Sequence, residues 1–371
     1  MSCRVGFDVS ILPHALGGIG RYLSGLAAGL LRTQGLEGVE VSVVDVPAAH
    51  PGLASPGLAS ARLKTPSYMR VPLLRRIPVS RGTEPASRGR RLAGLGRFDI
   101  YHHSGVQPAF PAGSASVVTL YDTSALEHPE WFTADTVRYA CIEARLARAG
   151  SRMVAISAWS ASRAAEVIGL PQDGIFVIGG AADDSFTTGD PDPAVLSRLG
   201  LERDTYILHV GNFVPSKNIP FLISAYSDAR LSGLELKLVL VGAGGWMRPD
   251  ATGQGVVALE AVPDDVLRTL YRGAALLVAP GLGEGLCLPL LEAFACGCGA
   301  ICSSAGALPE TAAGCAMVLD PSDRAAWSAA LRRTDGRAFP EELRGMAAAH
   351  ARTTWREVAL RLRSFYRGIC G

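Results

Sequence analysis

Short runs of apolar, often β-branched residues recur along the whole 371-residue chain, and longer amphipathic stretches separate them. Continuous apolar runs are typical of strands that are buried on both faces of a parallel sheet. The amphipathic stretches between them are long enough for crossover helices. The alternation therefore predicts an α/β fold built from βαβ units. The runs are Val5–Val9, Val41–Val44, Val117–Leu120, Met153–Ile156, Tyr206–Val210, Leu236–Val241, Ala274–Val278 and Gly299–Cys302.

A connector divides these runs into two sets of four. Residues 183–203 contain DDSFTTGDPDP, whose Gly, Pro, Thr and Asp content predicts a linker rather than a packed element. Each half then has the usual size of a doubly wound domain, and such sheets bind ligands at the carboxyl ends of their strands. We expect the active site in the cleft between the halves. The predicted parts are residues 1–186, a linker over 187–203, residues 204–353 and a C-terminal helix over 354–371.

The C-terminal helix has one apolar face. Apolar residues follow one another at three- and four-residue spacing from Thr354 onward, which predicts a helix that packs on another element. The residues of this face are Trp355, Val358, Ala359, Leu362 and Phe365.

Charge and composition argue against two broad classes of protein. The chain has 36 basic and 34 acidic residues, a net charge of +2, which does not favour nucleic acid as a partner. No stretch approaches the ~18 uninterrupted apolar residues that a membrane-spanning helix needs. Arg4 and Asp8 lie where a secretory signal peptide has its apolar core, so we expect a cytoplasmic protein.

The eight cysteines suggest neither a metal site nor a disulfide framework. They form no CxxC pair, and no histidine lies at ligand spacing from them. In a reducing compartment we expect free thiols. Cys296, Cys298 and Cys302 are then small buried residues at a helix-to-strand junction.

Residues 50–98 interrupt the alternating pattern. They are rich in Pro, Gly, Ser and Ala, and carry ten Lys or Arg residues against one acidic residue, Glu84. One interpretation is a surface loop with solvated charges. The other is a basic patch that contacts an anionic acceptor or acidic lipid head groups at the inner face of a membrane.

Two segments that follow predicted strands are suited to binding an anion. Glycines at 17, 18 and 20 precede an amphipathic helix, where backbone amides favour negative charge; a tight connection without a ligand is the alternative. Lys217, in GNFVPSKN at 211–218, follows the first strand of the second half. Its ammonium group could hold a phosphate at the sheet edge, or it could be a solvated surface lysine.

Two carboxylates lie eight residues apart in PGLGEGLCLPLLEA at 280–293. If a helix begins near Leu288, Glu284 lies at the mouth of the cleft and Glu292 about one turn inside it. Carboxylates accept hydrogen bonds from ribose or sugar hydroxyls, and the turn amides of residues 286–288 can bind a phosphate. The alternative is a solvated loop glutamate followed by an ordinary helix glutamate.

Polar residues also follow strands of the first half. Tyr121-Asp122-Thr123 comes after one apolar run, and His102-His103 comes after Asp99-Ile100-Tyr101. His103 or Asp122 could polarise a hydroxyl group, or both could bond to neighbouring loop backbone.

In this order, the segments resemble the retaining, nucleotide-sugar-dependent glycosyltransferases of family four, which have the two-Rossmann GT-B architecture. EGLCLPLLEAFACG at 284–297 is the most specific, because it is similar to the motif EGFGLPxLEAMACG. The other similar segments are GGIGRY at 17–22, HHSGVQPAFP at 102–111, TLYDTSALEHPEWF at 119–132, AISAWSASRA at 155–164, LHVGNFVPSKN at 208–218 and LVLVGAGGWM at 238–247. The last resembles a GxxGW turn of mannosyl- and rhamnosyl-transferase relatives, and it favours a GDP-linked sugar.

The resemblance implies metal-independent transfer of a hexose or deoxyhexose from a nucleotide diphosphate sugar, with no cofactor, to a glycan, lipid-linked or small-molecule acceptor. Lys217 would neutralise the diphosphate, Glu292 would hold the ribose and Glu284 the donor sugar. The C-terminal helix would cross back to the first domain. With Asp122 as a third catalytic residue, we expect donor contacts from Gly18, Asn212, Ser216, Lys217, Val262, Glu284, Leu286, Cys287, Leu288 and Glu292. We expect acceptor contacts from Arg21, Tyr22, His103 and Tyr121.

Two departures from the family pattern keep a second function open. Tyr121 stands where many relatives have histidine, and Ser216 stands where many have an arginine that binds phosphate. The alternative to an active transferase is therefore a catalytically silent GT-B protein that acts as a binding partner or scaffold in a glycan or natural-product pathway.

Overall fold

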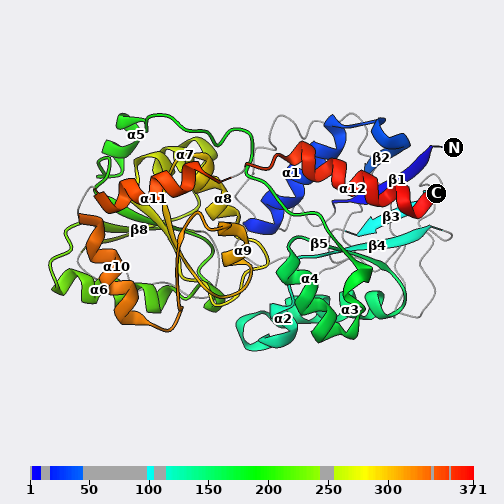
Figure 1. Ribbon diagram of the computed structural model, residues 1–371, viewed down its shortest axis with the longest axis horizontal. Coiled ribbons are helices and arrows are strands. Elements are labelled where there is room, and N and C mark those ends of the chain that lie inside the picture. Colours follow the sequence, from blue (N-terminus) through cyan, green and yellow to red (C-terminus); the bar gives the residue numbers. More distant parts are fainter. Residues whose placement is uncertain are drawn as a thin grey trace.

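Two parallel sheets, each covered by helices, form the two lobes of the molecule (Figure 1). The structure is a computed structural model that describes residues 2–9, 17–44, 98–103, 114–242, 255–335, 338–350 and 352–371. The basic segment 50–98, apart from Phe98, lies outside the described residues, as do 104–111 and 243–247 of the segments discussed above.

The first lobe contains a six-stranded sheet of order β2-β1-β3-β4-β5-β6, in which every described pair of neighbours is parallel. Its strands are β1 Cys3–Asp8, β2 Val39–Val44, β3 Ile100–His103, β4 Ala115–Leu120, β5 Arg152–Ala155 and β6 Ile175–Val177. Its helices are α1 Gly18–Arg32, α2 Ser124–Glu127, α3 Ala134–Arg148 and α4 Ala158–Ala164, the last continued by a π-helical turn over Ala165–Gly169.

The second lobe contains a parallel sheet of order β12-β11-β10-β7-β8-β9. Its strands are β7 Tyr206–Val210, β8 Lys237–Val241, β9 Val256–Leu259, β10 Leu276–Ala279, β11 Ala300–Ser303 and β12 Met317–Leu319. Its helices are α5 Pro193–Arg198, α6 Ile219–Leu231, α7 Asp264–Gly273, α8 Leu288–Ala295, α9 Leu308–Ala312, α10 Arg324–Arg332 and α11 Ala338–Ala348.

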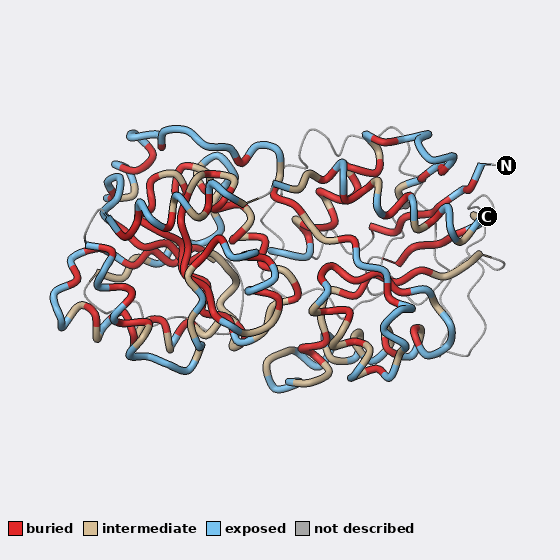
Figure 2. Tube along the Cα trace, viewed as in Figure 1, coloured by how far each residue is buried: buried red, intermediate tan, exposed pale blue. Residues whose placement is uncertain are grey.

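Each of the eight apolar runs overlaps a strand, which confirms the predicted fold class. Buried segments fill the middle of each lobe (Figure 2). The runs do not include β3, β6, β9 and β12. The last three lie at sheet edges and are apolar, but at three or four residues each they are too short to stand out as runs in the sequence. No helix in the described parts of the chain is long and apolar enough to cross a membrane.

The segment expected to be an unpacked connector is partly packed, and that expectation is wrong for its second half. Asp192 caps α5, since its carboxylate accepts hydrogen bonds from the amides of Ala194 and Val195. Leu196 and Leu201 are then buried in the core of the second lobe. The Asp-Pro pair, which also suits a turn, therefore begins a short helix here.

The C-terminal helix α12, Trp355–Cys370, packs on α1 in the first lobe, and the two helices lie side by side in Figure 1. Its predicted apolar face is confirmed, with Trp355, Val358 and Leu362 buried in the first core. Gly25 of α1 is needed for this contact. A Cβ atom there would lie 2.1 Å from the Trp355 ring.

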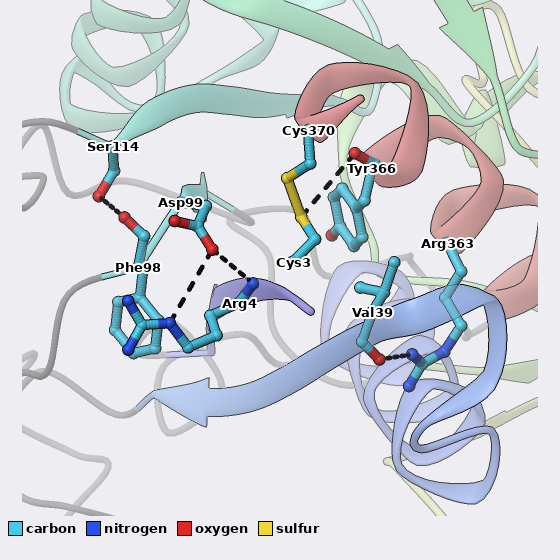
Figure 3. Close-up of a disulfide and its surroundings, with 9 residues drawn as sticks. All are labelled: Cys3, Arg4, Val39, Phe98, Asp99, Ser114, Arg363, Tyr366 and Cys370. Carbon is cyan, nitrogen blue, oxygen red and sulfur yellow. Dashed lines mark hydrogen bonds and ion pairs between the residues drawn. A yellow bond between two sulfur atoms is a disulfide. The ribbon is translucent and has the colours of Figure 1, made fainter. Parts of the chain in front are cut away.

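A disulfide joins Cys3 in β1 to Cys370 at the end of α12, so the expectation of free thiols is wrong for this pair (Figure 3). The two cysteines are 367 residues apart in sequence, and the packing of α12 on the first lobe brings them together. Cys296, Cys298 and Cys302 are free and buried, as predicted, the first two between α8 and β11 and the third within β11.

Buried histidines predict an acid-sensitive fold. Burial and the nearby charge of Lys217 lower the pKa of His209 to about 4, and the hydrogen bond that its ring donates to the Val278 carbonyl only partly opposes the fall. Below pH about 6.5 the unfolded chain takes up a proton at this position and the folded chain does not, so the histidine lowers stability as the pH falls towards 4. In urea unfolding between pH 6.5 and 4.5, we expect His209→Gln to reduce the pH slope of the unfolding free energy by about 1.4 kcal/mol per pH unit relative to wild type.

The matched control for this measurement is His128→Gln, which changes a half-exposed histidine. Parallel slopes for His209→Gln and wild type would contradict a neutral, buried His209.

Candidate active site

Lys217 and Glu284 lie where the strand order of the second sheet reverses. The neighbouring strands β7 and β10 lead to opposite sides of the sheet, and ligands of doubly wound folds bind at this point. Lys217 ends the 3-10 turn that follows β7, and Glu284 lies in the turn between β10 and α8. The Nζ atom of Lys217 donates a hydrogen bond to Oε1 of Glu284. The structure therefore brings together two of the three predicted catalytic residues.

Asn218 fixes the two turns against each other. Its backbone has φ 57°, in the left-handed region that asparagine tolerates better than most residues. Its side-chain amide donates to the carbonyl oxygen of Pro280 at 3.3 Å, where the second turn begins, and to that of Pro321 at 3.1 Å.

The Lys217 side chain is only 22% exposed and the Glu284 side chain 11%. Burial alone lowers the pKa of Lys217, but the Glu284 carboxylate, its hydrogen bond and further charges outweigh that effect, so the pKa is raised. Lys217 therefore keeps a positive charge in a poorly solvated position, which suits the neutralisation of a diphosphate.

Asp122, the third predicted catalytic residue, belongs to the first lobe and interacts electrostatically with Lys217. Burial raises the pKa of its carboxyl group, while a hydrogen bond from the Ser124 amide, at 2.9 Å, and the charge of Lys217 oppose the rise. Glu143 of α3 adds a neighbouring carboxyl group, whose pKa burial and Asp122 raise to about 8. Asp122 thus places an acidic group of the first lobe within electrostatic reach of Lys217.

Glu292 is buried about one turn into α8, where the sequence predicts it. Its carboxylate accepts a hydrogen bond from the Tyr271 hydroxyl at 2.9 Å and pairs with Nε of Arg21 at 3.0 Å. Burial raises its pKa, while Arg21 and Tyr271 oppose the rise. Arg21 comes from α1 in the first lobe and also pairs with Asp264 at 2.9 Å. Arg21, predicted to contact the acceptor, therefore contacts Glu292, the residue predicted to bind the ribose.

The turn before α8 offers backbone amides. Among the described residues, the amides of Leu286 and Cys287 donate no hydrogen bond, and Cys287 precedes the first turn of the helix. The Leu286 side chain packs near Tyr22, and Leu288 belongs to the core of the first lobe. These side chains anchor the turn, and the two amides are left for an anion.

Asn212 faces the glycine turn of the first lobe. A Cβ atom on Gly17 would lie 2.9 Å from the Asn212 side chain, and Gly17 has φ +95°, so only glycine fits here. Gly18 is open, with no atom within 4 Å of a Cβ placed on it.

Ser216 is buried, and its carbonyl oxygen accepts a hydrogen bond from the Leu282 amide at 2.7 Å. Val262 is partly buried against the second core.

Three predicted acceptor residues lie deeper than the sequence indicates. Tyr22 is buried in the first core, and its hydroxyl donates to the Gly179 carbonyl at 2.6 Å. His103 is buried within β3 rather than after it, and it is aligned with Asp8 of β1. Tyr121 packs edge-on against the Tyr22 ring.

Several residues of this region could not be predicted from the sequence. Tyr271 and Asp264 of α7, His209 of β7 and Glu310 of α9 carry no local signal, because each acts on a residue remote in sequence. Ser160 lies in the segment AISAWSASRA, for which the sequence shows only a similarity to the family. Its hydroxyl donates to the carbonyl of Tyr121 at 2.9 Å.

The chain is similar in sequence to known glycosyltransferases. Residues 204–334 match the family model of glycosyl transferases group 1. The chain is 30% identical over 226 residues to O-antigen chain mannosyltransferase B of Escherichia coli, a match that covers 58% of this chain and 59% of that protein.

Solved structures resemble the chain along nearly its whole length. Sucrose-phosphate synthase from Thermosynechococcus elongatus superposes with a TM-score of 0.67 at 18% identity, covering 99% of both chains. HepE of Anabaena in complex with UDP and glucose superposes with a TM-score of 0.68 at 14% identity, covering 98% of this chain and 99% of that one. At these identities the likeness establishes the fold. The chain therefore has the GT-B fold, and its second lobe matches the glycosyl transferases group 1.

Proposed function

We propose that the chain is a retaining glycosyltransferase that moves a hexose or deoxyhexose from a nucleotide diphosphate sugar to a glycan, lipid-linked or small-molecule acceptor. The Lys217–Glu284 pair carries this proposal, because it places a partly buried cation and a carboxylate at the switch point of the second sheet. That sheet lies in the part of the chain that matches the family model.

Each side chain has a role that its surroundings support. Lys217, charged and poorly solvated, binds the diphosphate, and the amides of Leu286 and Cys287 add hydrogen bonds to it. Glu292 binds the ribose hydroxyls in place of part of its present contact with Arg21. Glu284 accepts hydrogen bonds from the donor sugar and stabilises the positive charge that develops at its anomeric carbon.

The reaction breaks the bond between the anomeric carbon and the diphosphate oxygen and forms a bond from that carbon to an acceptor oxygen on the same face. The acceptor hydroxyl loses its proton to the departing diphosphate. Asp122 faces Lys217 from the first lobe and orients the acceptor hydroxyl. Protein groups neutralise the diphosphate in this scheme, so we propose that transfer needs no metal ion and continues in EDTA.

The donor that we propose first is GDP-mannose. The relative in Escherichia coli is named a mannosyltransferase of O-antigen chains, and the GxxGW segment at 242–246 resembles mannosyl- and rhamnosyl-transferases. An acceptor of the O-antigen class, a lipid-linked or growing polysaccharide, follows from the same relative.

A thermal-shift panel tests this function. UDP, GDP, TDP and ADP, each free and with common sugars, are added in EDTA to wild type and to Lys217→Ala. A ligand at about 100 times its dissociation constant stabilises the native state by about 2.7 kcal/mol, which raises Tm by roughly 5 °C or more. We expect a shift with one nucleotide family, lost in the variant. No shift with any ligand would favour the silent binding partner.

A further inference from the structure

Glu310 contacts the opposite lobe without touching the donor residues. It is an exposed residue of α9 in the second lobe, and its carboxylate accepts two backbone hydrogen bonds from the first turn of α4 in the first lobe. The Ala158 amide donates to Oε1 and the Trp159 amide to Oε2, both at 2.8 Å. Two charge-assisted bonds from one carboxylate fix both the distance and the orientation of the partner.

The same turn of α4 reaches the catalytic segments through Ser160. This serine is fully buried, and its hydroxyl lies 2.9 Å from the Tyr121 carbonyl and 3.3 Å from the Gly285 carbonyl. Tyr121 precedes Asp122, and Gly285 follows Glu284. One hydroxyl therefore touches the backbone next to a catalytic carboxylate of each lobe.

The residues just before α9 contact the backbone of Glu284. The Ala307 amide, one residue before α9, donates to the Glu284 carbonyl at 2.8 Å. Gly306 packs so closely that a Cβ atom there would lie 2.6 Å from the Glu284 backbone nitrogen. The helix that carries Glu310 is thus tied directly to the backbone of Glu284.

We propose that Glu310 is a positioning residue that clamps α4 to α9 and so aligns Asp122 of the first lobe with Lys217 and Glu284 of the second. The contacts form a closed series between the lobes. Glu284 bonds to Ala307 next to α9, Glu310 of α9 bonds to α4, and Ser160 of α4 bonds to Gly285, the neighbour of Glu284. The effect of the clamp on catalysis rests on the proposed function. Its effect on the contact between the lobes does not.

Hydrogen exchange tests the clamp without any substrate. In Glu310→Ala, we expect the amides of Ala158 and Trp159 to exchange about ten times faster than in wild type, because they lose their acceptor. Glu310→Gln keeps amide-oxygen acceptor capacity but no charge, so we expect an intermediate rate. Glu341→Ala, an exposed helix glutamate of the same lobe, is the matched control and is expected to match wild type. Unchanged exchange in Glu310→Ala would overturn the proposal.

Steady-state kinetics test the positioning role. We expect Glu310→Ala to lower kcat about ten-fold and to leave the KM for the donor within about two-fold, because the donor residues are untouched. Glu310→Gln is expected to recover part of kcat. Ser160→Ala is expected to lower kcat similarly while the Ala158 and Trp159 amides stay protected, since the Glu310 contact remains. A wild-type kcat in Glu310→Ala would overturn the positioning role.

The two proposals fail in different ways. If wild type transfers no sugar from any donor and binds no nucleotide, the proposed function fails, and the exchange rates still decide whether Glu310 holds the lobes together. If wild type is active but Glu310→Ala exchanges and turns over like wild type, only the clamp fails.

Discussion

A Lys217→Ala variant is expected to lose at least about 100-fold in kcat/KM for sugar transfer. Removing a buried charged partner costs about 3 kcal/mol or more, and each 1.36 kcal/mol corresponds to ten-fold in rate. The variant loses the cation for the diphosphate and leaves Glu284, 11% exposed, without its ion pair. Initial rates of nucleoside diphosphate release, measured with GDP-mannose and the other donors of the thermal-shift panel, provide the test.

Two further variants make this result specific. Lys217→Arg keeps the charge but presents a planar fork in place of a compact ammonium group, so we expect it to recover only a small part of the activity. Lys237→Ala removes an exposed lysine of β8 that donates to the Gly200 carbonyl, and it is expected to keep wild-type activity. Activity in Lys217→Ala within a few-fold of wild type, in a folded protein, would remove Lys217 from the site.

The sequence predicts the central strands because burial constrains them. A strand such as β10, whose four residues are all buried, must be apolar throughout. Edge strands such as β6 and β12 are also apolar, but at three residues each they are too short to stand out as runs in the sequence. β3 is absent from the apolar runs for another reason, because its second half is polar. His102 can be fully buried there because its two ring nitrogens form hydrogen bonds with the hydroxyls of Thr119 and Tyr366. These partners are remote in sequence, so the sequence does not reveal them.

The same distinction applies to the site. Lys217 and Glu284 can be predicted because both follow central strands, and parallel topology brings the carboxyl ends of such strands to one edge. The contacts of Arg21 with Glu292 and of Glu310 with α4 cross between lobes, so no local pattern encodes them. Spacing within one lobe can therefore indicate donor residues, whereas the residues that bring the lobes together emerge only from the structure.

A Gly285→Ala variant is expected to lose about 100-fold in kcat while keeping nucleotide binding within a few-fold of wild type. The reason is that a Cβ atom at Gly285 would lie 1.9 Å from the Tyr121 carbonyl oxygen. Backbone cannot yield as a flexible side chain does, so the lobes must separate, which moves Asp122 away from Lys217 and leaves Lys217 and Glu292 in place. Gly345→Ala in α11 is the control, since its Cβ meets nothing within 4 Å. Kinetics, nucleotide titration and small-angle scattering together test the variant. A fully active, compact Gly285→Ala protein would show that transfer does not need the contact between Tyr121 and Gly285.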